Sequence, residues 1–401
     1  MLSKKTQTIT PSYTVGISAK VKSLIAQGID IIDLSIGEPD FNTPLAGKTK
    51  AIQAIEADLT KYDLVPGLND LRALICKKLK DENNVYYTPS DIVVSSGAKN
   101  AITNALMATL DPGDEVIIPS PYWTSYPEMV KLCHGIPVIV NTQAKNDFKL
   151  TLPEFISKIT DKTKLLLINN PSNPTGAVYT KEELEPLIAY CIEHQILILA
   201  DEIYEKICYD FDFVSIPSLS EQAKAITILV NGFSKSAAMT GWRLGYTASP
   251  PEIAKAMATI QGHLVSHPST ISQWAACGAL LSGEGEMATM VQTYKMRRDQ
   301  LLPYLKLMPK LDFILPQGAF YLFINISAYK EYYKNYESMS GTFCEQLLTS
   351  QFVAVVPGIA FGNDNYIRIS YATSIDKVIE GLSRINIFLE SLESLESLEN
   401  K

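Results

Sequence analysis

Two residues that could form a reactive site each come directly or shortly after an apolar run in the middle of the chain. Asp201 follows the run Ile196–Ala200, and Lys235 follows Thr227–Val230. A lysine can form a Schiff base with an aldehyde when neighbouring positive charge lowers its pKa. A carboxylate at the end of a buried strand needs a partner, because an unpaired buried charge is costly. A protonated ring nitrogen on a ligand would serve as that partner.

Other residues after such runs could bind an anion or an aromatic ring. Gly97 precedes a helix start, where free N–H groups and the helix dipole favour an anion. Arg243 could add a fork-shaped clamp on a phosphate. Trp123 offers a flat face for stacking. Asn173 and Tyr204 could donate hydrogen bonds to a phenolate oxygen.

Phosphate, pyridine ring, phenolate and aldehyde together describe pyridoxal 5′-phosphate, whose protein partners are a Schiff-base lysine and a carboxylate on the ring nitrogen. Each residue also has a simpler interpretation. Lys235 could be a surface charge, Asp201 a helix N-cap, Trp123 a core residue, and Asn170–Gly176 a turn cluster. Their joint placement after successive strands favours the cofactor site.

The apolar runs that position these residues alternate with helical patterns over about 200 residues. Continuous rather than alternating hydrophobicity predicts strands of a parallel sheet that is covered on both faces. Such an α/β sheet binds ligands beyond the carboxyl ends of its strands. The runs are Asp91–Val94, Glu115–Ile118, Lys164–Ile168, Ile196–Ala200 and Thr227–Val230.

The flanking segments predict a second, discontinuous lobe. We expect an N-terminal arm that is part of a small domain (1–45), a large cofactor-binding domain (46–290) and a small C-terminal domain (291–401). Strand candidates in the last part are Phe320–Ile324, Val353–Val356 and Tyr366–Ile369. The Ser-Leu-Glu tail has a period of three, which drifts around a helix and predicts a fraying helix end.

Composition excludes several classes of protein. The 401 residues are 46% hydrophobic and 19% charged, which is typical of a globular chain. A net charge of -8 disfavours nucleic acid as a partner. No apolar run is long enough to span a membrane, the N-terminus does not resemble a secretory signal, and the six cysteines lack paired spacing. We therefore expect a cytoplasmic protein, and no spacing of histidines and cysteines predicts a metal site.

The segment Gly232–Gly245, GFSKSAAMTGWRLG, resembles the complete cofactor-lysine signature of the class I pyridoxal-phosphate aminotransferases, most similar to the bacterial aspartate aminotransferase subgroup. Further family-like stretches keep the family order from about residue 10 to residue 385. They are Gly37–Phe41, Lys61–Tyr62, Ser120–Trp123, Asn173–Gly176, Asp201–Tyr204 and Tyr366–Ser370. The resemblance implies an α/β fold of the type I pyridoxal-phosphate transferases, with a large, mostly parallel seven-stranded sheet domain and a smaller discontinuous α+β domain.

The resemblance also implies catalytic roles. Lys235 would hold the cofactor as a Schiff base and then move the proton between substrate Cα and cofactor. Asp201 would keep the pyridine nitrogen protonated, and Tyr204 would bind the cofactor 3-oxygen with Asn173. The remaining cofactor contacts would be Ala98, Lys99, Trp123, Ser234, Arg243 and, from the neighbouring subunit of a homodimer with shared active sites, Tyr62.

The substrates implied are an L-amino acid and a 2-oxo acid that react in a ping-pong cycle. Arg368 would bind the α-carboxylate, Gly37 would lie over the substrate, and Lys99 would meet a distal carboxylate. Trp123 and Asn173 would border the substrate as well. Aspartate and glutamate with oxaloacetate and 2-oxoglutarate are thus favoured.

One segment departs from the family pattern. Gly262–Pro268, GHLVSHP, replaces an expected Ser/Thr-rich stretch near the neighbouring site. Aromatic, prephenate or other amino-acid aminotransferases therefore remain alternatives. A lyase or a non-catalytic ligand-sensing relative is disfavoured, because Arg368 and Lys99 are both present and no DNA-binding module is evident.

Overall fold

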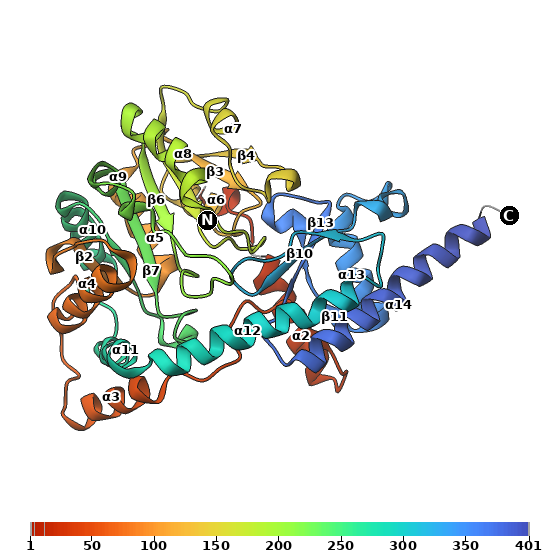
Figure 1. Cartoon of the computed structure of the whole chain (residues 1–401), viewed down its shortest axis with the longest axis horizontal. Coiled ribbons are helices and arrows are strands. Elements are labelled where there is room, and N and C mark those ends of the chain that lie inside the picture. Colours follow the sequence, from red (N-terminus) through yellow and green to blue (C-terminus); the bar gives the residue numbers. More distant parts are fainter. Residues whose placement is uncertain (1, 4, 12, 400–401) are drawn as a thin grey trace.

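The computed structural model describes residues 2–3, 5–11 and 13–399, and places three β-sheets among them (Figure 1). The largest has seven strands in the order β2-β8-β7-β6-β5-β3-β4. Pairing is parallel from β4 through β7, and it is antiparallel where β8 meets β7 and β2. The strands are β2 (Ile92–Ser95), β3 (Glu115–Ser120), β4 (Ile136–Asn141), β5 (Thr163–Asn169), β6 (Leu197–Asp201), β7 (Thr227–Gly232) and β8 (Gly245–Ala248).

All five predicted runs form strands of this sheet, but the expectation of parallel pairing is wrong for Asp91–Val94, which forms β2. The strands β4 and β8 were not predicted. Parallel neighbours need a long crossover, whereas β8 returns from β7 through the loop that carries Lys235 and only a short 3₁₀ turn. It therefore runs antiparallel to β7, and β2 pairs with β8 at the sheet edge.

Helices cover both faces of the sheet, and this explains the continuous apolar runs. Within β5, Leu165 and Leu167 pack toward α5, α6 and α10, whereas Leu166 and Ile168 pack toward α8 and α9. Near the sheet edge, α4 and α11 cover β2, β7 and β8. The helices of this part are α3 (Leu45–Glu56), α4 (Asn69–Asn83), α5 (Ala98–Thr109), α6 (Tyr126–Leu132), α7 (Leu152–Ile156), α8 (Lys181–His194), α9 (Glu221–Ile226), α10 (Pro251–Leu264) and α11 (Thr270–Ser282).

Two smaller sheets lie in the other half of the molecule (Figure 1). One is antiparallel in the order β12-β13-β10-β9, and the other pairs β1 with β11 in parallel. The predicted strand Val353–Val356 is thus divided between two sheets, which the continuous apolar run could not indicate. The strands are β1 (Ile32–Asp33), β9 (Asp312–Phe313), β10 (Tyr321–Asn325), β11 (Val353–Ala354), β12 (Val356–Pro357) and β13 (Tyr366–Ser370).

The two halves are joined by a long helix, α12, which runs beside the C-terminal helix α14 (Figure 1). In α14, Leu389 and Leu392 are buried, so this part of the tail packs as core rather than frays. The side chains of Leu395 and Leu398 lie outside the described residues. No described helix is long and apolar enough to cross a bilayer. The remaining helices are α1 (Lys5–Thr8), α2 (Tyr13–Ala26), α12 (Glu284–Leu305), α13 (Met339–Gln351) and α14 (Ile375–Glu399).

Candidate active site

A cavity of about 360 Å³ opens at the carboxyl ends of β5, β6 and β7 and extends to β10 and β13 of the smaller half. This is the edge at which the sequence predicts a site, and all but one of the predicted site residues line it. The predicted residues in its wall are Gly37, Ala98, Lys99, Trp123, Asn173, Asp201, Tyr204, Ser234, Lys235, Arg243 and Arg368.

The Lys235 side chain lines the cavity and donates a hydrogen bond to the Gly37 carbonyl oxygen at 2.5 Å. Burial lowers the pKa of Lys235 to about 8; Glu38 opposes this change, and the positive charges of Arg368 and Arg243 add to it. A lysine with such a pKa is partly a neutral amine near neutral pH, and the neutral amine is the form that attacks a carbonyl carbon.

Gly37 allows the N-terminal segment to approach this lysine closely. A Cβ atom at Gly37 would lie 2.5 Å from the Tyr321 hydroxyl oxygen, much closer than non-bonded atoms approach. A side chain here would therefore displace the 35–38 segment or Tyr321. The glycine thus belongs to the wall of the cavity, and its place over a bound substrate stays a prediction.

Asp201 ends β6 with its carboxylate buried, 3% exposed. One oxygen accepts a hydrogen bond from the Tyr126 hydroxyl at 2.6 Å, and the other accepts one from the Ile203 N–H at 3.2 Å. Burial raises the pKa of Asp201 to about 6, while the bonds from Tyr126 and Ile203 and the charge of Lys235 act in the opposite direction. The expectation that this buried carboxylate needs a cation is therefore met only in part within the protein, because its two direct partners are neutral donors.

A chain of polar contacts connects the other side of the cavity. Arg368 donates to the Asn173 Oδ1 at 2.9 Å and to the Ser35 carbonyl at 2.8 Å, and its guanidinium carbon lies 4.3 Å from the centre of the Tyr321 ring. The hydroxyls of Tyr321 and Tyr204 are 2.9 Å apart. The Nε of Arg368 is buried without a partner among the described residues, so the guanidinium keeps donor capacity for an anion.

The third part of the cavity is suited to a phosphate. Gly97, with φ +90°, occupies the cap position of α5, so the first N–H groups of this helix have no partners within it. A Cβ at Gly97 would come 2.8 Å from an Arg243 guanidinium nitrogen, and this shows how closely Arg243 approaches the helix start. Ser234 lines the same region. These donors form a cradle for an anion.

Trp123 and Lys99 form the wall beside this cradle. The Lys99 ammonium lies 4.9 Å from the centre of the Trp123 ring. Burial lowers the pKa of Lys99, and the charge of Arg243 acts in the same direction. A second negative group on a ligand would offset the cost of keeping the positive charges of Lys99 and Arg243 close together.

Tyr62 is the one predicted site residue that does not line this cavity. Its side chain is 91% exposed and makes an edge contact with the His267 ring at 5.8 Å. His267 also accepts a hydrogen bond from the Asp63 N–H at 3.1 Å. The segment Gly262–Pro268, which departs from the family pattern, therefore supports the loop that carries Tyr62. The role of Tyr62 in a second subunit's site stays a prediction.

Sequence reasoning missed several residues of the cavity. Tyr126 lies three residues after Trp123 at the start of α6, so the family-like stretch pointed near it without reaching it. Tyr321 lies inside the predicted strand Phe320–Ile324, where an aromatic residue indicates only core packing. The other missed wall residues are Ser18, Ser35, Ile36, Glu38, Asn169, Ile203 and Thr240.

The family model described as "Aminotransferase class I and II" matches residues 29–385. An aspartate aminotransferase of Bacillus sp. (strain YM-2) is 43% identical, over 97% of this chain and 99% of that protein. A probable aspartate/prephenate aminotransferase of Aquifex aeolicus is also 43% identical, over 98% of this chain and 99% of that protein.

Among solved structures, the aspartate aminotransferase from Thermus thermophilus with maleate superposes with a TM-score of 0.91. The two sequences are 39% identical, and the superposed region covers 96% of this chain and 98% of the Thermus chain. Sequence and structure thus agree over nearly the full length. The chain belongs to the class I and II aminotransferases, and it is an aminotransferase enzyme.

Proposed function

We propose that this enzyme uses pyridoxal 5′-phosphate to move an amino group between L-aspartate or L-glutamate and oxaloacetate or 2-oxoglutarate. The observation that carries the proposal is one cavity in which the amine of Lys235, the carboxylate of Asp201 and the guanidinium of Arg368 face a common space. The names of the relatives, aspartate and aspartate/prephenate aminotransferase, support the substrate class.

The residues present fit this cofactor. The cradle of Gly97, Ser234 and Arg243 suits its phosphate, and Trp123 offers a flat face to its ring. When bound, the cofactor supplies an aldehyde and a pyridine ring that withdraws electrons from substrate Cα. Lys235 would hold the aldehyde carbon, and Asp201 would keep a proton on the ring nitrogen.

The protein's own groups then orient the substrate and move one proton. Arg368 binds the α-carboxylate and thereby directs the Cα–H bond at the Lys235 amine. With its pKa lowered to about 8, Lys235 can accept that proton and return it without a large energetic cost. Lys99 binds the distal carboxylate, and this contact favours dicarboxylic substrates over other amino acids.

The first experiment records the near-ultraviolet and visible absorbance of the purified protein with pyridoxal 5′-phosphate while L-aspartate and then L-phenylalanine are added. We expect a cofactor band that aspartate shifts at lower concentration than phenylalanine. Prephenate is then offered as amino acceptor, since relatives include aspartate/prephenate enzymes. A protein that develops no cofactor band would contradict the proposal.

Arg368→Lys should raise the KM for aspartate roughly 10- to 100-fold, because charge-assisted hydrogen bonds contribute about 1.5–3 kcal/mol each and lysine cannot make a two-point contact. The KM for phenylalanine should rise similarly, since both substrates carry an α-carboxylate. Lys99→Met is the matched comparison and should raise the KM for aspartate alone. If Arg368→Lys leaves both values unchanged, another group binds the α-carboxylate.

Tyr126→Phe should shift the acidic limb of the pH–rate profile toward higher pH. The Tyr126 hydroxyl donates to the Asp201 carboxylate and so helps to keep the pKa of that carboxyl from rising beyond about 6. Without this bond the carboxyl protonates more readily, and we expect about a tenfold loss of kcat at pH 6. Tyr122→Phe, at a neighbouring tyrosine, is the control. An unchanged profile in Tyr126→Phe would show that this hydroxyl does not tune Asp201.

The enzyme is further proposed to work in the cytoplasm as a homodimer in which Tyr62 reaches the partner subunit's cofactor phosphate. The exposed ring of Tyr62 supports the shared site. The cysteines, none of which is bridged in the described structure, support the cytoplasmic assignment. Mixing Tyr62→Phe and Lys235→Ala subunits tests the shared site, because a mixed dimer then contains one site with both defects and one site with neither.

A further inference from the structure

A second cavity of about 300 Å³ lies behind the loop that carries the reactive lysine. Asn231, Gly232, Phe233, Ser236 and Ala237 line this second cavity, whereas Ser234 and Lys235 between them line the active site. The loop is therefore a shared wall with one face toward each cavity. Helices α4, α11 and α12 supply most of the rest of the second wall, and Glu205, Lys206 and Tyr246 complete it.

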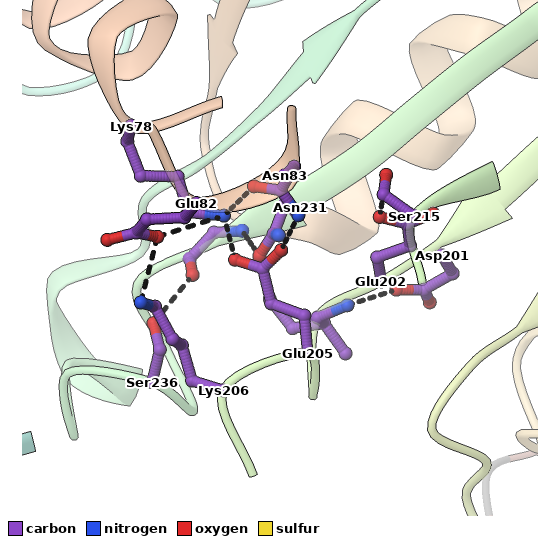
Figure 2. A network of polar contacts seen from close by, with 12 residues as sticks. Lys78, Glu82, Asn83, Asp201, Glu202, Glu205, Lys206, Ser215, Asn231 and Ser236 are labelled. Atoms are coloured by element: carbon purple, nitrogen blue, oxygen red, sulfur yellow. Dashed lines mark hydrogen bonds and ion pairs between the residues drawn. The ribbon is translucent and has the colours of Figure 1, made fainter. Parts of the chain in front are cut away.

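A closed network of ion pairs forms the polar side of this second cavity (Figure 2). Lys78 contacts the Glu205 carboxylate, the Asn83 side-chain oxygen at 2.7 Å and Glu82 at 3.5 Å. Lys206 binds Glu82 at 2.8 Å, and Asn83 donates to Glu205 at 2.7 Å. The two ammonium groups are thus already paired with the two carboxylates. Neither is left over to recruit an anion.

Asn231 is the polar group of this wall whose bonding is incomplete. Its side chain is 1% exposed, and its Oδ1 accepts a hydrogen bond from the Gly232 N–H at 2.7 Å. Its Nδ2 is buried without a partner among the described residues. A buried amide with unused N–H groups costs free energy unless an acceptor is supplied. Because Asn231 lines the cavity, that acceptor can come from a molecule inside it.

The remaining wall offers an acceptor and an apolar surface. The Ser236 hydroxyl donates to the Gly232 carbonyl at 3.2 Å, so its oxygen lone pairs can accept a hydrogen bond. Ile75, Phe233 and Met287 provide apolar contact. Glu284 adds a negative charge at the α12 end of the wall, which further disfavours an anionic ligand.

We propose that this second cavity is a binding site for a small uncharged molecule with an apolar body and a carboxamide group. The carboxamide oxygen accepts from Asn231 Nδ2, its N–H donates toward Ser236, and the apolar body lies against Phe233 and Met287. Such a ligand contacts the backbone that carries Lys235 without entering the active site. The site therefore goes beyond the proposed transamination and takes a different class of molecule.

Benzamide is a suitable probe, with benzoate as the charged analogue of the same shape. Binding is measured by ligand-observed NMR on the enzyme with pyridoxal 5′-phosphate and saturating succinate, which occupies the carboxylate sites of the active cavity. We expect a dissociation constant of about 1 mM for benzamide, typical of a fragment of this size. Benzoate should bind at least about tenfold more weakly, because of the surrounding carboxylates.

Ala288→Trp tests the location, because Ala288 is an exposed residue of α12 that lines the cavity, and a large ring there fills the space. Thr289→Trp, at the next exposed position of the same helix outside this wall, is the matched control. We expect Ala288→Trp and Asn231→Ala to weaken benzamide binding at least tenfold, and Thr289→Trp to leave it unchanged.

Three results would overturn the proposal: no benzamide binding to the wild-type enzyme, binding that survives Ala288→Trp, or equal binding of benzoate. The readout is binding rather than turnover, so these results are independent of whether the proposed reaction is correct.

Discussion

Lys235→Ala should lower the turnover number at least about 10⁴-fold while the protein stays folded and binds pyridoxal 5′-phosphate without a covalent bond. The variant loses both the amine that holds the aldehyde and the group that moves the Cα proton, and proton transfer alone contributes about 10²–10⁴-fold. Steady-state transamination of aspartate, together with borohydride trapping of the cofactor, measures both losses.

The control for this substitution is Lys255→Ala, at an exposed lysine on α10 outside the cavity. It should retain wild-type turnover and covalent trapping. Near-wild-type turnover in Lys235→Ala would contradict the central assignment of the site.

A pH dependence follows from the same lysine in the wild-type enzyme. Its pKa is lowered to about 8, so the neutral, nucleophilic amine increases as pH rises through that value. Covalent uptake of pyridoxal 5′-phosphate by the cofactor-free enzyme should therefore accelerate between pH 7 and pH 8 and level off above it. Stopped-flow absorbance measures this rate, and a rate that keeps rising about tenfold per pH unit through pH 9 without levelling off would indicate an ordinary lysine.

Asp201→Asn should reduce the turnover number by roughly 10²–10³-fold, the usual cost of removing one preorganised electrostatic group from an active site. Asparagine has the same shape and can still accept from the Ile203 N–H, so the end of β6 should keep its structure. What it lacks is the negative charge that holds a proton on the ring nitrogen.

Two further variants test whether the negative charge itself is needed: Asp201→Glu keeps the charge, and Asp161→Asn is the control for the same substitution elsewhere. Asp201→Glu restores the charge at a displaced position and should recover part of the activity. Asp161→Asn removes an exposed carboxylate far from the cavity wall and should have no effect. Equal activity in Asp201→Asn and wild type would show that the carboxylate does not act on the cofactor.

The sheet and its reactive edge could be predicted because both depend on local patterns. Runs such as Lys164–Ile168 are apolar at every position after the first, which requires helices on both faces, and the core confirms this arrangement. Parallel strands end at the same edge, so residues after β5, β6 and β7 converge there. Asn173, Asp201 and Lys235 were predicted together for this reason, and the structure places all three in one cavity.

The direction of a strand and the sheet that it joins do not depend on such local sequence patterns. The apolar run that forms β2 resembles the others, yet among the described strands it pairs with β8 alone, and β8 runs in the opposite direction. The run Val353–Val356 is continuous, but β11 and β12 pair with strands from different parts of the chain. Such pairings depend on which distant segment lies alongside, and hydrophobicity does not record this.

The sequence by itself determined the family-like lysine segment, five of the seven strands of the largest sheet, and the residue types of the site. These properties depend on spacing and side-chain chemistry within short stretches. Only the tertiary structure decided that Tyr126 donates to Asp201, that Tyr321 joins Tyr204 to Arg368, and that the lysine loop separates two cavities. Each of these contacts joins residues that are far apart in the chain or opposite faces of one loop, and packing of whole elements, rather than local sequence, brings them together.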